Sequence, residues 1–150
     1  MRLPLTFVEK LGAPRELVFD EVTDFEHLGE KFPNIFVSIR VIKRSRNVVV
    51  TEERFSAFGM VIGQRSRHTT RKSTSHAVEI LTGDLAGSRV LERYSDADDG
   101  GTIVNVRADL SIRGLASVLP QFVLGPMVET NLRRVFGELQ ARLSAAGPSS

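Results

Sequence analysis

Side chains able to take part in proton transfer recur through the middle of this 150-residue sequence. General acid–base chemistry needs such a group beside a donor or acceptor that holds the reacting atom. The candidates that fall on predicted strands are Gln64, His68, Glu92 and Tyr94. If the strands turn these side chains toward one interior, they could exchange a proton with an enclosed organic molecule.

His68 and His76 flank a predicted turn near Lys72, so they would face each other across a hairpin. Two imidazoles could begin a metal site, but a zinc site needs three or four ligands. No third histidine lies nearby in the sequence, and the chain has no cysteine. We therefore predict neither a metal site nor a cofactor.

Other catalytic signatures are missing from the sequence. There is no Gly-x-Ser-x-Gly elbow and no glycine-rich phosphate loop, which disfavours the hydrolase and nucleotide-binding classes. The absence of cysteine also excludes disulfides and a cysteine nucleophile.

Length and composition fit one globular domain, placed at residues 1–146, with residues 147–150 as a disordered tail. The 20 cationic residues against 18 anionic ones leave a net charge of +2, so we predict no nucleic-acid partner. The first ten residues lack a signal-peptide core, and no run approaches the roughly 20 apolar residues of a membrane span. A cytoplasmic location is the default expectation.

The elements that must position these side chains follow from the hydrophobic period. Alternation over residues 3–10 predicts a strand, and helical spacing after Pro14 predicts two short helices that Pro33 ends. Six further strands are predicted at 35–42, 48–57, 60–71, 76–86, 89–96 and 102–113. Short connections make these strands an antiparallel meander. The helical period returns near the end, and the main C-terminal helix is expected to begin at Pro126.

Three segments accompany this order of elements: APRELVF at 13–19, VTDF at 22–25 ahead of Phe32 and Pro33, and DGGT at 99–102. Together with the order, they resemble the START/birch-pollen-allergen-like (SRPBCC) superfamily, especially its polyketide cyclase/dehydrase-like or coenzyme Q-binding-like branch. The resemblance implies an α+β helix-grip fold: a curved seven-stranded antiparallel sheet around a long C-terminal helix, with two short helices after strand one. It also implies a ligand cavity between sheet and helix, and we carry over no catalytic residue.

Strand parity predicts which side chains would face that cavity, because the apolar set of a half-buried strand turns inward. On strand 60–71 the alternative set is cationic, so the set that contains Gln64 and His68 is expected inside. The predicted ligand-binding residues on the strands are Phe55, Met60, Ile62, Gln64, His68, Glu92, Tyr94 and Val106.

The same parity would turn Glu53 and Glu92 inward, where a carboxylate is costly unless it is paired or hydrogen-bonded. An inward Glu92 would orient a ligand or serve as an acid. The alternative, which we favour, is a bulged strand that puts Glu92 in water.

Two residues of the predicted C-terminal helix, Met127 and Asn131, lie near its apolar stripe and complete the ligand-binding set. The alternatives are ordinary packing for Met127 and solvent exposure for Asn131. Tyr94 is the only tyrosine, and core packing with a satisfied hydroxyl is the alternative to a ligand contact.

Basic residues gather at two predicted turns that share one end of the sheet: Arg40, Lys43, Arg44, Arg46, Arg71 and Lys72. We call this set the basic rim. It could meet an anionic membrane surface in a transient contact. A solvated edge that discourages strand addition is the favoured alternative.

We therefore expect a carrier or sensor that binds a hydrophobic small molecule or lipid in an internal cavity. The first alternative is a polyketide cyclase/dehydratase-type enzyme that uses acid and base residues of the cavity. The second is a membrane-surface or protein interaction module. Of the enzyme and the non-catalytic carrier, the carrier is favoured.

Overall fold

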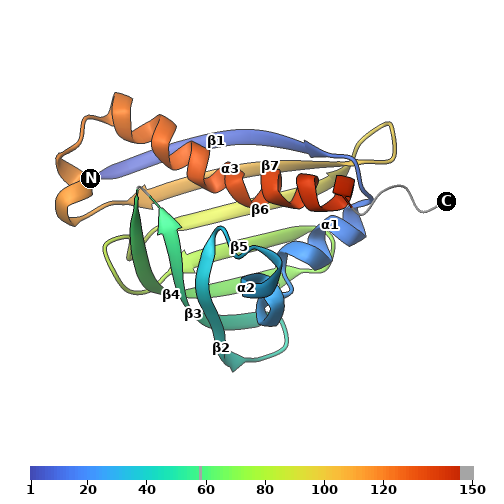
Figure 1. Ribbon diagram of the computed structural model, residues 1–150, viewed down its shortest axis with the longest axis horizontal. Coiled ribbons are helices and arrows are strands. Elements are labelled where there is room, and N and C mark those ends of the chain that lie inside the picture. Colours follow the sequence, from blue (N-terminus) through green and yellow to red (C-terminus); the bar gives the residue numbers. More distant parts are fainter. Residues whose placement is uncertain (58, 146–150) are drawn as a thin grey trace.

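The computed structural model describes residues 1–57 and 59–145, which form a seven-stranded antiparallel sheet and a set of helices (Figure 1). The strands are β1 (Arg2–Leu11), β2 (Phe36–Arg44), β3 (Val48–Ala57), β4 (Met60–Arg71), β5 (Ser75–Ile80), β6 (Arg89–Asp96) and β7 (Thr102–Ser111). The helices are α1 (Arg15–Val22), η1 (Phe25–His27), α2 (Leu28–Lys31), η2 (Gly114–Val118) and α3 (Gln121–Ala145). The predicted tail at 147–150 lies outside the described residues.

The strands follow one another across the sheet in the order β1-β7-β6-β5-β4-β3-β2, so β1 pairs with the last strand. Every pairing is antiparallel. The sheet curves, α3 lies across its concave side, and α1 and α2 lie near one end (Figure 1). This architecture confirms the predicted α+β helix-grip fold. No helix among the described residues combines the length and apolarity needed to cross a membrane.

Two predicted boundaries are wrong by five residues or more. The strand expected at 76–86 ends at Ile80, because Gly83 and Gly87 adopt positive φ angles that interrupt the ladder. The main helix begins at Gln121 and contains Pro126 in its interior. Its first turns persist despite the proline, since Leu124 is buried in the core and holds them there.

The C-terminal helix lies mainly against β1, at one side of the sheet. Arg133 fixes this contact: it pairs with Glu9 and lies 4.5 Å from the ring centroid of Phe7. Arg134 reaches the opposite side, where it donates to the carbonyl oxygens of Asn34 and Ser56 at 2.7 and 3.1 Å. The helix is thus held on both sides, and most of its contacts with the sheet are on the first.

The packed side is filled by alternate residues of β7 and its extension. The inward residues Val104, Val106, Ala108, Leu110 and Ile112 are all buried, as parity predicts. Burial of each valine, leucine or isoleucine side chain in this set stabilises the fold by about 1.5–3 kcal/mol. The space between α3 and the strands β3, β4 and β5 is packed less completely, and a cavity lies there.

Candidate functional site

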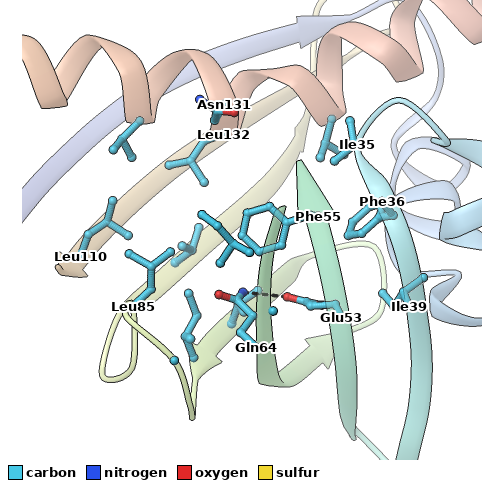
Figure 2. Close-up of a pocket in the computed structure, with 18 of the residues that line it drawn as sticks. Ile35, Phe36, Ile39, Glu53, Phe55, Gln64, Leu85, Leu110, Asn131 and Leu132 are labelled. Atoms are coloured by element: carbon cyan, nitrogen blue, oxygen red, sulfur yellow. Dashed lines mark hydrogen bonds between the residues drawn. The ribbon is translucent and has the colours of Figure 1, made fainter. Parts of the chain in front are cut away.

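A cavity of about 550 Å³ lies between α3 and the strands β2 to β7. This volume is typical of small-molecule sites. Figure 2 shows apolar side chains converging on it from the strands, from α3 and from the β5–β6 connection. The apolar lining includes Ile35, Phe36, Ile39, Phe55, Ile62, Val78, Leu85, Leu110, Val128 and Leu132.

The two ends of the cavity are built differently. At one end Val22, Phe25 and Leu28, from the helices after β1, close the space and are themselves buried. At the other end the lining residues Met60, Val61, Gly83, Asp84 and Arg113 are exposed, and we call this set the mouth. The mouth therefore lies at the β3–β4 and β5–β6 connections, beyond the reach of the short helices.

Glu53 and Gln64 form a buried polar pair in the cavity wall. Gln64 Nε2 donates to Glu53 Oε1 at 2.8 Å, and the Ser66 hydroxyl donates to the same oxygen at 2.8 Å. The Thr51 hydroxyl donates to Glu53 Oε2 at 3.0 Å. Three donors on one carboxylate offset the cost of its desolvation.

The carbonyl oxygen of Gln64 has no hydrogen-bond partner among the described residues, although it is buried. Figure 2 shows this oxygen on the side of the amide away from Glu53. The amide orientation is set by Glu53, because a carboxylate accepts from the NH₂ group and repels the oxygen. An unmade hydrogen bond at a buried acceptor costs about 1–3 kcal/mol, so this atom is suited to a ligand donor.

A row of hydrogen bonds continues from Thr51 across β4, β5 and β6. Thr51 Oγ1 lies 2.9 Å from His68 Nε2, and His68 Nδ1 lies 2.9 Å from His76 Nε2. His76 Nδ1 lies 2.7 Å from Glu92 Oε1, to which the Tyr94 hydroxyl donates at 2.6 Å. We call Glu53, Thr51, His68, His76 and Glu92 the polar chain.

Burial determines the protonation states of His68 and of Tyr94, which bonds to the end of the polar chain. Desolvation, together with the nearby charge of His76, lowers the pKa of His68 to about 3, so His68 is neutral at pH 7. Burial, together with the negative charge of Glu92, raises the pKa of Tyr94 well above its ordinary value. Phe25 covers both imidazoles, with its ring centroid 4.3 Å from that of His68 and 5.7 Å from that of His76.

The structure brings most of the predicted ligand-binding residues to the cavity. Those that line it are Phe55, Met60, Ile62, Gln64, His68, Glu92 and Asn131. Asn131 also donates to the carbonyl oxygen of Met127 at 2.8 Å. Tyr94, Val106 and Met127 are not in the wall: Tyr94 packs edge-on against Phe19, Val106 belongs to the packed core, and Met127 lies on α3 outside the lining.

The favoured prediction for Glu92, a bulge that turns it to water, is wrong. The pairing of β6 is regular on both sides, and the Glu92 side chain is only 12% exposed. Its cost of burial is offset by Tyr94, on the same face of β6, and by His76, which the sequence pattern did not place beside it. The expected facing of His68 and His76 is also wrong: His68 pairs with Val78, and the imidazoles meet diagonally.

Several lining residues were not predicted. Ile35, Phe36 and Ile39 come from β2 and the segment before it, while Leu85 comes from a predicted strand that is a loop. His76 was considered only as a metal ligand. Its position beside His68 on the inward parity of the next strand was the available signal. The described residues contain no group of three or more His, Cys, Asp or Glu arranged to hold a metal ion.

The basic rim lies at the closed end of the cavity, where the Thr70 N–H donates to the carbonyl of Asn47 and joins the two turns. Arg44 pairs with Glu26, and Arg40 pairs with Glu52. A membrane contact made by this rim would therefore leave the mouth facing away. Contact with a membrane stays a prediction.

Comparisons with known proteins were made for the sequence and for the structure. No family model matches the sequence, and no curated protein matches it significantly. The structure, in contrast, is similar to many solved ones.

The aromatase/cyclase Zhui from Streptomyces sp. R1128 has a TM-score of 0.75 at 18% identity, over 98% of this chain and 99% of that one. A START superfamily protein from Mycobacterium smegmatis has a TM-score of 0.81 at 12% identity, over 95% of this chain and 98% of that one. Ara h 8.0201 has a TM-score of 0.72 at 14% identity, over 97% and 99% of the two chains. With its cavity between sheet and helix, this chain has the helix-grip fold of the START and aromatase/cyclase structures, as the sequence resemblance implies.

Proposed function

We propose that this protein binds a neutral, largely apolar small molecule that carries a hydroxyl group, and that it acts as a carrier or sensor of that molecule. The observation that carries the proposal is the unpaired carbonyl oxygen of Gln64 in the wall of an otherwise apolar cavity. The apolar walls would bind the body of the ligand through the hydrophobic effect. The Gln64 oxygen would accept a hydrogen bond from the hydroxyl and fix its orientation.

The charges in the wall support a neutral ligand. The carboxyl groups of Glu53 and Glu92 line the cavity, whereas Arg113, a basic residue of the lining, is exposed at the mouth. A ligand carboxylate placed beside Gln64 would face Glu53 in a low-dielectric interior, where like charges repel strongly. Fatty acids are therefore expected to bind less well than the corresponding alcohols.

The test uses three ligands with one aromatic body: 1-pyrenemethanol, 1-methylpyrene and 1-pyrenecarboxylate. A neutral hydrogen bond contributes about 0.5–1.5 kcal/mol, so the alcohol should bind about two- to twelvefold more tightly than the methyl compound. The carboxylate should bind most weakly. Fluorescence titration of the three compounds measures the ratios.

The matched control is Gln64→Leu, which replaces the acceptor amide by an apolar side chain of similar size and also removes one of the three donors to Glu53. This variant should bind 1-methylpyrene and lose the preference for the alcohol. Equal affinities for alcohol and methyl compound in the unmodified protein would contradict the role of Gln64. Failure of all three compounds to bind, with no apolar molecule retained in native mass spectrometry, would contradict the carrier function.

Acid–base side chains in the cavity wall favour a second function, a cyclase or dehydratase. Glu53, His68, His76 and Glu92 all line the cavity, and similar structures include the aromatase/cyclase Zhui. Turnover of an aromatic polyketide-like substrate that falls at least tenfold in Glu53→Gln would support this function. Turnover that this variant leaves unchanged would remove Glu53 from the chemistry.

A further inference from the structure

The polar chain joins two carboxyl groups on separate strands through groups that both donate and accept hydrogen bonds. Its consecutive separations are 3.0 Å from Glu53 Oε2 to Thr51 Oγ1, 2.9 Å to His68 Nε2, 2.9 Å from His68 Nδ1 to His76 Nε2, and 2.7 Å from His76 Nδ1 to Glu92 Oε1. Each separation lies within the range of a good hydrogen bond. No gap therefore interrupts the row from Glu53 to Glu92.

The number of protons in this row is restricted. The contact between His68 Nδ1 and His76 Nε2 has room for one proton, because two N–H groups facing each other at 2.9 Å would clash. The pKa of His68, lowered by burial to about 3, agrees with a ring that carries a single proton. His68 must then donate from one nitrogen and accept at the other.

With Glu92 ionised, two arrangements of the same protons satisfy every hydrogen bond. In the first, Glu53 is ionised and accepts from Thr51, His68 donates from Nε2 to Thr51, and His76 carries both ring protons beside ionised Glu92. In the second, Glu53 is protonated and donates to Thr51, Thr51 donates to His68 Nε2, and His68 Nδ1 donates to a neutral His76. They differ by three protons, each moved along one hydrogen bond.

We propose that the polar chain is a proton relay that places one proton either on Glu53, in the cavity wall, or on His76, beside Glu92. Glu53 itself lines the cavity, so a ligand hydroxyl can reach its carboxyl group from there. The relay would thus make Glu53 a general acid and base for that group. A phenolic or enolic hydroxyl is the class of substrate it fits, because an aliphatic hydroxyl is too weak an acid.

The proton transfer balances without any other reactant. To accept a proton, the row must begin with one proton fewer than in either arrangement, with Glu53 ionised and His76 neutral. The ligand O–H bond then breaks as an O–H bond forms on Glu53, the ligand oxygen keeps the electron pair, and the row reaches the second arrangement. Glu53 then passes a proton to Thr51, Thr51 to His68, and His68 to His76, which becomes an imidazolium beside Glu92. The reverse sequence returns the proton to the ligand, and nothing is oxidised or reduced.

The surroundings favour transfer along the row over exchange with water. Thr51 is fully buried, while His68 and His76 are 6% and 5% exposed. Phe25 covers the two rings from η1 and carries no charge. Tyr94 donates to Glu92 and holds it in place at the far end.

The experiment reads the tautomer of His68 by long-range ¹H–¹⁵N NMR in the ligand-free protein, so it does not depend on ligand binding. In the unmodified protein at pH 7, His68 should carry its proton on Nε2. In Glu53→Gln, the donors Gln64 and Ser66 hold the new amide oxygen in place, so its NH₂ group faces Thr51. Thr51 must then donate to His68, and the populated tautomer should invert from Nε2–H to Nδ1–H.

Two further variants make the test specific. Thr51→Val interrupts the row at a buried position, so Glu53→Gln made in that background should no longer invert the His68 tautomer. Glu92→Gln removes the counterion of His76 at the opposite end, and it should invert the tautomer as Glu53→Gln does. Glu92→Gln also provides the test of the relay if the Glu53→Gln protein does not fold. His27, exposed and bonded to Asp24, is an internal reference that should not change.

Inversion in Glu53→Gln or Glu92→Gln that requires Thr51 supports the relay. An unchanged His68 tautomer in a folded Glu53→Gln or Glu92→Gln protein would overturn it. Inversion that persists with Thr51→Val would also overturn it. The relay rests on the proposed function only for the identity of the ligand group that exchanges a proton with Glu53. If the pyrene compounds do not bind, the proposed function fails, but the expected His68 tautomers in the ligand-free protein do not change.

Discussion

The two ends of the cavity differ in composition, although the strands β3 and β4 run through both. Near the mouth, Met60 and Val61 are apolar and about half exposed, at 53% and 51%. Further along β4, the strand that contains Met60 and Val61, the side chains of Gln64, Ser66 and His68 are polar and buried. The usual distribution of apolar and polar side chains is reversed along one strand.

The difference shows where a polar side chain can be placed inside a protein at low cost. At the closed end the helices exclude water, and each polar group finds a partner on a neighbouring strand. At the mouth, exposed apolar side chains favour the approach of an apolar ligand. The closed end therefore governs stability and orientation, and the mouth governs access.

Acid should destabilise the closed end by the largest amount. The pKa of His68 falls from 6.5 to about 3 on folding, so the unfolded chain binds the proton more readily. This contribution to stability is complete above pH 6.5 and is lost as the pH falls from 6.5 toward 3. At about 1.4 kcal/mol per pKa unit, the loss approaches about 5 kcal/mol.

Urea unfolding at pH 7, 5.5 and 4 measures this loss. His68→Gln keeps hydrogen-bonding groups and cannot titrate, so its stability should fall less steeply over the same pH range. Equal slopes for both proteins would show that His68 is not the group responsible.

Replacing the aromatic cover of the closed end should have the next largest effect. Phe25 is 2% exposed and lies over both imidazoles. Phe25→Ala should lower the free energy of unfolding by about 3–5 kcal/mol, since it opens a space above buried polar groups. Thermal and urea unfolding provide the measurement, and a loss below about 1 kcal/mol would contradict the assigned packing.

A glycine near the mouth should show an intermediate effect. Gly83 has a φ of +88°, and an added Cβ would lie 3.0 Å from the carbonyl oxygen of Gly63. Gly83→Ala should therefore cost about 1–2 kcal/mol, from the left-handed backbone and the close contact. Gly125→Ala is the control, since nothing lies within 4 Å of its Cβ position, and it should not destabilise the fold.

The smallest effect is expected for an aromatic residue outside the core. Phe122, at the start of α3, is 81% exposed. Phe122→Ala should change the free energy of unfolding by no more than about 0.5 kcal/mol. Measured beside Phe25→Ala, it compares one substitution at two levels of burial. A large loss would show that Phe122 packs against a surface of the protein.

Much of the fold could be predicted because it depends on period. Alternation on β4 and β7 assigned the inward faces correctly, including Gln64 and His68. The end of β5 was missed because Leu85 fits a strand pattern, whereas the backbone at Gly83 and Gly87 prevents one. The start of α3 was missed because burial of Leu124 outweighs the local effect of Pro126.

The site was harder to predict because it depends on register between strands. Parity brought His68 and Glu92 inward but could not show that His76 lies between them. That contact arises because β4 pairs with β5 so that Thr70 faces His76. The pattern of one strand carries no information about its neighbour's offset, so Glu92 had no predicted partner and was assigned to water.

The pairing of β1 with β7 has a consequence for how the protein is made. Residues 2–11 find their partner strand about one hundred positions later, and the N-terminal amine of Met1 donates to the carbonyl of Ile112. During synthesis the first strand therefore leaves the ribosome long before its partner exists. Contacts of such high sequence separation slow folding, and the emerging chain exposes an unpaired edge until most of it has been translated.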